Sequence, residues 1–167
     1  MKTTIVYFFL LIISTNSIFA QIGENDYDPR VKKNLDDLSV KYAITENNNF
    51  KLIFNTEKNG DGRTQLVIIN SNTEKYDEIE VREIFSVIKK GKNLNELDES
   101  ILQILLKRND TIKMGSWCIS EDENSYYIVF AIKAGANMNK TMLESILSLI
   151  AAESDKVEKE IFGGDIF

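Results

Sequence analysis

The order in which helical and strand-like hydrophobic patterns follow one another is the feature that most constrains the fold of this chain. A helical pattern over about 29–41 precedes three strand patterns, a second helical pattern, two more strand patterns and a last helical pattern. Short turns separate the strands, and no right-handed crossover unit is indicated. This α-β-β-β-α-β-β-α order predicts a single α+β domain with a mainly antiparallel sheet and helices packed against it.

The ends of these elements have typical signals. Asp28 and Pro29 favour a helix start, because aspartate caps the first turn and proline lacks an N–H that would be unpaired there. Gly163 is expected to end the last helix, which we place over about 140–162. The second strand is apolar on both faces, which predicts a central position in the sheet. The strands are expected at about 50–55, 63–70, 79–88, 113–120 and 126–133.

The amino-acid composition argues against several common catalytic and binding functions. The chain has no histidine, so it lacks the commonest general base and zinc ligand. Its one cysteine, Cys118, forms no intramolecular disulfide, and the fold must therefore rest on an apolar core. A hydrophobic content of 43% is enough for such a core. The net charge of −6 gives no general attraction to phosphate backbones, and we expect no nucleic-acid partner.

The first 20 residues have the layout of a secretory signal peptide. Lys2 supplies a positive start, an apolar run follows over 5–13, and Ala20 is a small residue at the expected cleavage point. The run is well short of the roughly 20 residues that span a bilayer, so a retained membrane anchor is the weaker alternative. We expect an exported protein, periplasmic or secreted, without a membrane span after cleavage. The expected division is a signal peptide at 1–20, a lead-in at 21–29 and the domain at 30–167.

No catalytic, cofactor or metal site is predicted. The segment 57–62 resembles the first half of a calcium-binding loop, with oxygen-bearing side chains at alternate positions and a glycine at the sixth. The glutamate that should close such a loop is replaced by Ile68, and the flanking patterns are strands. A plain hairpin turn is therefore expected. A hydrolytic pair of carboxylates stays open, because acidic residues are many and their spacing in space is unknown.

Residues within the strand patterns can have structural or functional roles. Glu83 falls on an apolar strand face, where it needs an arginine partner or a bulge that turns it outward. Arg82 is expected to pair with an acidic residue on the sheet. Trp117 is expected to be buried and structural rather than an exposed anchor, with Gly115 leaving room for a neighbouring ring. Cys118 is expected to be buried as a small hydrophobe.

The second helix has an apolar arc that is wider than one sheet face requires. We predict that this arc contacts a partner protein or a second copy of the chain. The predicted contact residues are Leu97, Ile101, Leu102, Leu105 and Leu106.

Four short segments resemble one known family. They are Glu74–Tyr76, Glu80–Ser86, Lys113–Trp117 and the tail from Glu158 to Phe167. They resemble the YbjN-like family, which is labelled as candidate bacterial sensory transduction regulators and is similar in fold to type III secretion chaperones. The resemblance covers roughly residues 30–167. It implies a bacterial source, the same element order and a non-enzymatic, protein-binding character, whereas the signal peptide departs from the family's usual cytosolic picture.

Taken with the missing catalytic parts, this resemblance favours a non-enzymatic, exported protein-binding or regulatory module of the bacterial envelope. One alternative is an envelope structural or stress protein without a defined partner. The other is a hydrolase that uses carboxylates alone. No cofactor is expected.

Overall fold

The computed structural model describes residues 27–56 and 63–163. The predicted signal peptide and the predicted turn at 57–62 lie outside the described residues. The helices are α1 (Pro29–Asp37), α2 (Glu99–Thr111) and α3 (Lys140–Phe162), and a short 3-10 helix, η1, spans Leu94–Glu96. The strands are β1 (Ala43–Ile44), β2 (Phe50–Asn55), β3 (Thr64–Ile69), β4 (Glu74–Tyr76), β5 (Ile79–Gly91), β6 (Ser116–Glu121) and β7 (Tyr126–Gly135).

The strands form one antiparallel sheet in the order β1-β2-β3-β5-β7-β6, and β4 pairs with the first part of β5. This arrangement confirms the predicted α+β class and the central position of β3. The sequence pattern missed β1 and β4, because strands of two and three residues are too short to show a period.

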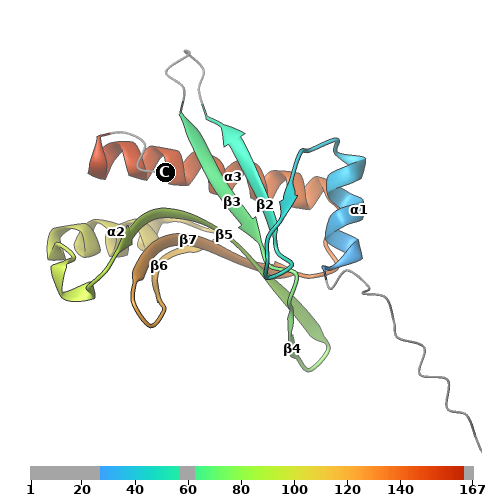
Figure 1. Cartoon of the computed structure of the whole chain (residues 1–167), viewed down its shortest axis with the longest axis horizontal. Coiled ribbons are helices and arrows are strands. Elements are labelled where there is room, and N and C mark those ends of the chain that lie inside the picture. The colour runs from blue at the N-terminus through green and yellow to red at the C-terminus, as the bar shows by residue number, and fades with distance from the viewer. Residues whose placement is uncertain (1–26, 57–62, 164–167) are drawn as a thin grey trace, which may run out of the picture.

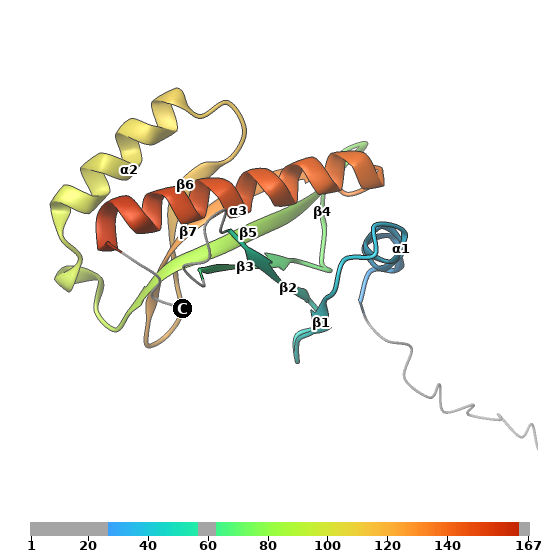
Figure 2. The same cartoon turned by 90° about the horizontal axis from the view of Figure 1, so that it is seen from above.

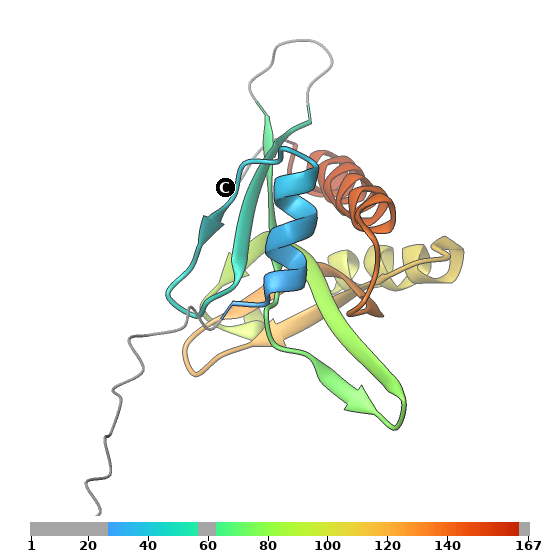
Figure 3. The same ribbon diagram turned by 90° about the vertical axis from the view of Figure 1, so that its right-hand side faces the viewer.

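The helices cover one face of the sheet (Figures 1 and 2). α3 lies across β3, β5 and β7, and α2 lies beside it against β6. α1 packs against the start of α3, where the side-chain amide of Asn34 donates to the carbonyl oxygen of Met138 over 3.0 Å. α1 lies at the same end of the molecule as β1 and the hairpin of β4 and β5 (Figures 1 and 3).

The core fills the space between α3 and the sheet. α3 begins at its N-cap Asn139 and ends at Gly163, whose φ of 77° is the left-handed conformation expected of a glycine cap. Between these caps it presents apolar residues at spacings of three and four, and each buried leucine, isoleucine or valine contributes roughly 1.5–3 kcal/mol of hydrophobic stabilisation. Its buried apolar residues are Leu143, Ile146, Leu147, Ile150, Ala151 and Val157, and the sheet supplies Phe50, Leu52, Val67, Ile69, Ile84, Ile88, Ile128, Phe130 and Ile132.

Two helix boundaries differ from the sequence expectation. α1 ends at Asp37 rather than near 41, because Ser39 takes a φ of 56° that breaks the helical path. The sequence pattern predicts that Asn93 caps the second helix, but α2 begins after its N-cap Asp98 and Asn93 caps the short η1 helix before it. Within 27–56 and 63–163, no helix is long and apolar enough to cross a membrane.

Candidate functional site

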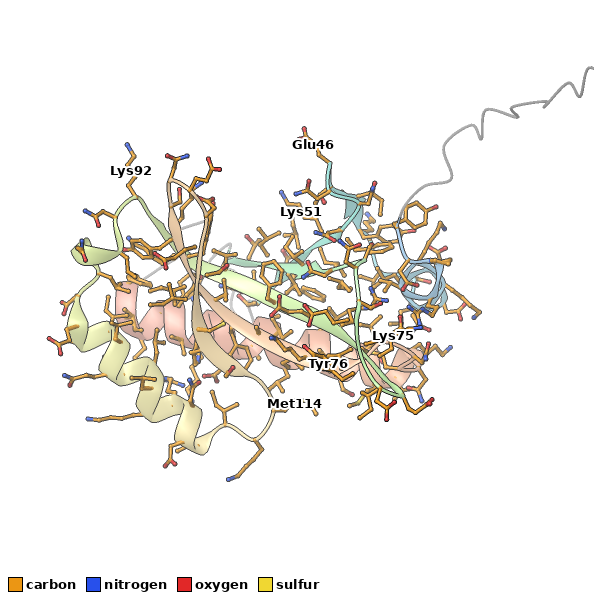
Figure 4. All side chains as sticks on the ribbon, turned by 90° about the horizontal axis from the view of Figure 1, so that it is seen from below. Glu46, Lys51, Lys75, Tyr76, Lys92 and Met114 are labelled. Carbon is orange, nitrogen blue, oxygen red and sulfur yellow. The ribbon has the colours of Figure 1, made fainter. Side chains whose placement is uncertain are left out.

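Strand alternation sends one set of side chains toward α3 and the other set to the face that no helix covers. Figure 4 looks onto this uncovered face, with the strands in front of α3. Cross-strand register brings apolar residues of neighbouring strands together there: Ile68 lies opposite Phe85, and Val129 lies opposite both Val87 and Cys118. We call this surface the open face. Its apolar members are Ile53, Leu66, Ile68, Phe85, Val87, Cys118, Val129 and Ala131.

Exposure across the open face falls from β2 toward β7. Ile53 on β2 is 64% exposed, and the side chains of β3 and β5 on this face are partly exposed. Val129 on β7 is only 5% exposed because its cross-strand neighbours cover it. A contiguous apolar area of this kind is unusual on a protein that functions alone and is typical of a contact surface.

A groove of about 440 Å³ lies on the open face where β5, β7 and β6 meet. Its polar groups are few: the carboxylate of Glu83 lies at one end, and Tyr127 donates its hydroxyl to Asp122 over 2.7 Å at the other. A smaller, polar hollow of about 140 Å³ adjoins it and shares Glu83. The residues that line the groove are Glu83, Phe85, Val87, Cys118, Ile119, Ser120, Tyr127 and Val129.

Cys118 corrects one prediction. It is exposed rather than buried, because β6 is an edge strand and Cys118 points to the open face while its neighbour Trp117 points to the core. Partial burial of the sulfur raises the pKa of the Cys118 thiol, and the nearby carboxylate of Glu83 adds to this rise. The thiol is therefore accessible but weakly ionised near neutral pH.

Glu83 corrects a second prediction, which asked for an arginine partner or a local bulge. The strand alternation is as predicted, but the face on which Glu83 lies has no helical layer, so its carboxylate stays partly exposed. It accepts a hydrogen bond from Asn70 Nδ2 over 3.4 Å and lies opposite Lys133 in the ladder. The irregularity in β5 falls between Val87 and Lys89 instead.

Arg82 pairs with an acidic residue, as predicted, but that residue is not on the sheet. The partner is Asp28, the N-cap of α1. Arg82 also donates to the carbonyl oxygens of Asn70 and Ser71 in the loop after β3. Burial opposes ionisation of Asp28, but hydrogen bonds from Arg30 and Arg82 outweigh it and hold the pKa of Asp28 at about 2.

A second arginine extends this cluster at the surface. Arg30 binds Asp28 and also reaches Glu80 on β5, with its Nη1 2.7 Å from Glu80 Oε2. Hydrogen bonds from Arg30 and from Thr73 hold the pKa of Glu80 at about 2. Each charge of the cluster thus has a partner within the protein, and the cluster ties α1 to the sheet.

Trp117 is buried, as predicted, with 4% of its surface exposed. Its ring lies 5.1 Å from that of Phe130, centroid to centroid. Gly115 has a φ of 88°, and a Cβ placed there would lie 2.8 Å from Phe130 Cζ, so the missing side chain does leave room for a neighbouring ring. The side-chain amide of Asn109 on α2 accepts from the backbone N–H of Trp117 over 2.7 Å and donates to its carbonyl over 3.0 Å.

The last contact escaped sequence reasoning. Asn109 and Asn139 each begin an Asn-X-Thr sequence, which matches the short and unspecific N-glycosylation sequon. The structure uses both side chains internally: Asn109 binds Trp117, and Asn139 accepts from the backbone N–H of Met142 as a helix cap. Only the pairing of α2 with β6 shows what Asn109 does.

The five predicted contact residues of the second helix are divided by the structure. Leu105 is buried in the core, and Leu97 and Ile101 pack against the core from its margin. Leu102 is partly exposed, and Leu106 is 68% exposed. Their role in partner binding stays a prediction, and Leu106 is the member that offers most surface.

Metal binding and hydrolysis by carboxylates each need several suitable side chains close together. No cluster of three or more cysteine or acidic side chains suited to a metal ion occurs there. Glu83 is the one carboxylate among the residues that line the groove. A pair of facing carboxylates, which hydrolysis without histidine would need, is therefore not present in this groove.

Comparison with known proteins gives a limited result. No protein-family model matches the chain, and no curated protein matches it. Among solved structures, the chain is similar to the crystal structure of YbjN, a proposed transcription regulator from E. coli. The similarity covers 81% of this chain and 92% of that chain, with a TM-score of 0.48 and 10% sequence identity. These comparisons assign the chain to no family.

Proposed function

We propose that this chain is a non-enzymatic binding module of the bacterial envelope, exported by the signal peptide of its first 20 residues, which receives a partner protein on the open face of its sheet. The observation that carries the proposal is the apolar open face itself. One face of the sheet is covered by helices, and the other presents apolar side chains and a groove without a covering layer.

The extent of the open face favours a protein over a small ligand. Its apolar members come from β2, β3, β5, β6 and β7, so the surface reaches well beyond the groove. Its centre is aliphatic and aromatic, and charged groups such as Lys51 and Lys133 lie nearer its margin. An apolar centre with a polar margin is the usual anatomy of a protein–protein interface.

A matched pair of substitutions tests which surface binds. Ile53 on the open face and Leu106 on α2 are almost equally exposed, at 64% and 68%. Neither Ile53→Lys nor Leu106→Lys should disturb the core, and thermal melting checks this. The tagged protein captures partners from envelope extract, and mass spectrometry measures their stoichiometry. We expect one stoichiometric protein that Ile53→Lys loses and Leu106→Lys keeps.

The reverse pattern, loss with Leu106→Lys alone, would move the binding surface to α2. Capture of no stoichiometric protein would favour the alternative of an envelope structural or stress protein without a defined partner. Export has its own test, which is N-terminal sequencing of the protein from cells. A mature chain that begins near Gln21 is expected, and a retained Met1 would contradict export.

A further inference from the structure

β6 forms one end of the sheet, so one side of its backbone faces away from β7 with no strand beside it. The N–H and C=O of Trp117 are on that outer side, since both bind the side chain of Asn109. Outward groups alternate along an antiparallel strand, and those of Ile119 and Glu121 therefore point the same way. Within 27–56 and 63–163, no recorded hydrogen bond fills the outward groups of these two residues.

Asn109 closes the first part of this edge in the manner of a neighbouring strand. Its amide offers one acceptor and one donor to the backbone of a single residue, which is what a paired strand residue would offer. The closure stops at Trp117, so the unfilled part of the edge runs from Ile119 to Glu121. Unpaired edges are normally protected, and here the protection is partial.

We infer that the edge from Ile119 to Glu121 accepts an extended segment of the partner, which adds to β6 as a further strand. The inference rests on the proposed function, because it names how part of the partner would sit. A strand added to β6 places alternate side chains on the open face beside Cys118 and Ser120, both of which line the groove. The backbone edge and the apolar groove would then be filled by one segment.

The charges around the edge indicate the chemistry of that segment. Glu121 is the last residue of the edge, Asp122 and Glu123 lie in the turn that follows it, and all three are exposed. They outnumber Lys90 and Lys92 at the same end. A segment with apolar residues over the groove and a basic residue beside this turn is complementary to the site. A second copy is disfavoured, because its β6 (Ser116–Glu121) carries no basic residue to place beside the acidic turn.

The test uses synthetic ten-residue peptides and the full chain. The first peptide alternates valine and threonine and ends in two lysines, and the second replaces the lysines by glutamates. The third has an amphipathic helical pattern of the same length. Affinity is measured by isothermal titration calorimetry for every variant, and protection of the Ile119 amide in hydrogen exchange locates the bound peptide in the parent protein. We expect the lysine peptide to bind and to protect this amide, the glutamate peptide to bind at least about tenfold more weakly and the helical peptide not to bind the edge.

Ile119→Pro and Asn109→Ala should change the affinity for the lysine peptide in opposite directions. Ile119→Pro removes the outward N–H and leaves the ladder with β7 in place, because that N–H does not point to β7, and it should abolish binding of the lysine peptide. Ile119→Thr keeps the N–H and should keep binding, as the matched control. Asn109→Ala frees the backbone of Trp117 and lengthens the edge, so affinity should rise roughly 2- to 10-fold.

Peptide binding that survives Ile119→Pro, or the absence of binding by the lysine peptide, would overturn the inference. Binding of the helical peptide with loss on Ile53→Lys would assign the open face to a helix instead. The proposed function survives either result if the envelope partner is still captured and is still lost with Ile53→Lys. It fails together with the inference only if that capture fails as well.

Discussion

Arg82 and Asp28 form a buried ion pair that joins the middle strand β5 to the first turn of α1. Only 1% of Arg82 is exposed, and the same guanidinium holds the two carbonyl groups of the loop after β3. Three segments that are distant in the sequence therefore meet at one side chain. Burial lowers the pKa of Arg82, whereas Asp28 favours its charged form.

Removal of Arg82 should be costly. Arg82→Ala leaves the Asp28 carboxylate buried with one fewer cationic partner, and breaking a buried pair in this way typically costs about 3–5 kcal/mol. Urea denaturation measures the change in the free energy of unfolding. Lys33→Ala is the control, because it removes only the exposed i,i+4 pair with Asp37 and should change the free energy of unfolding little. Similar losses in the two variants would contradict a structural role for the buried pair.

Acid should remove the contribution of Asp28. The pKa of Asp28 is about 2 in the folded protein and 3.8 ordinarily, so its carboxylate stabilises the fold fully above about pH 4 and loses this effect as the pH falls toward 2. The contribution is about 2 kcal/mol. Glu80 titrates in the same range, and the measurement is therefore the stability gap between the parent and Asp28→Asn. The gap should narrow below about pH 4; a constant gap would contradict the prediction.

Trp117 should carry a large share of the stability at the β6 end. Its ring packs on Phe130, and its indole nitrogen lies 3.4 Å from Glu153 Oε1. Trp117→Ala should cost roughly 3–5 kcal/mol, and Trp117→Phe much less. The exposed Leu106 gives the comparison, since Leu106→Ala should change stability by less than about 0.5 kcal/mol. A melting temperature of Trp117→Ala close to that of the parent would instead indicate a binding role.

Gly115 and Gly135 allow a test of what an added methyl group costs at a crowded position and at an open one. Gly115 has a φ of 88°, and an added Cβ would lie 2.7 Å from Ile132 Cγ1 and 2.9 Å from the carbonyl oxygen of Ala131. Gly115→Ala should therefore cost at least about 2 kcal/mol from crowding and strain. A Cβ at Gly135 meets nothing within 4 Å, and Gly135→Ala should be neutral or stabilise by up to about 1 kcal/mol. Equal effects in thermal melts would refute this packing.

Cys118 should react with a thiol reagent in the folded protein. Its sulfur is exposed on the open face, but its raised pKa keeps the reactive thiolate scarce near neutral pH. Labelling without denaturant should go to completion and should accelerate as the pH rises. Glu83→Gln removes a negative charge and should speed labelling at a given pH, whereas Glu123→Gln should not. No labelling before unfolding would show that the thiol is covered.

The sequence by itself determined the local structure of this protein. The helical and alternating patterns predicted the three helices and the five longer strands, and the caps at Asp28 and Gly163 were readable because capping depends on the residue and its immediate neighbours. Burial of Trp117 also followed from local pattern. β1 and β4 were missed, since their pairing with distant residues, rather than a period of their own, makes them strands.

Only the tertiary structure decided which face of the sheet is exposed and which distant side chains contact each other. The pattern of β3 shows two apolar faces, but a single long helix can cover only one of them, and nothing local says which. Cys118 on β6 was expected to be buried but is exposed, because it lies on the face of the sheet that no helix covers. The partner of Arg82 is 54 residues away, and Asn109 reaches Trp117 only because α2 packs beside β6. Contacts of this kind depend on how the whole chain packs, which short sequence periods do not encode.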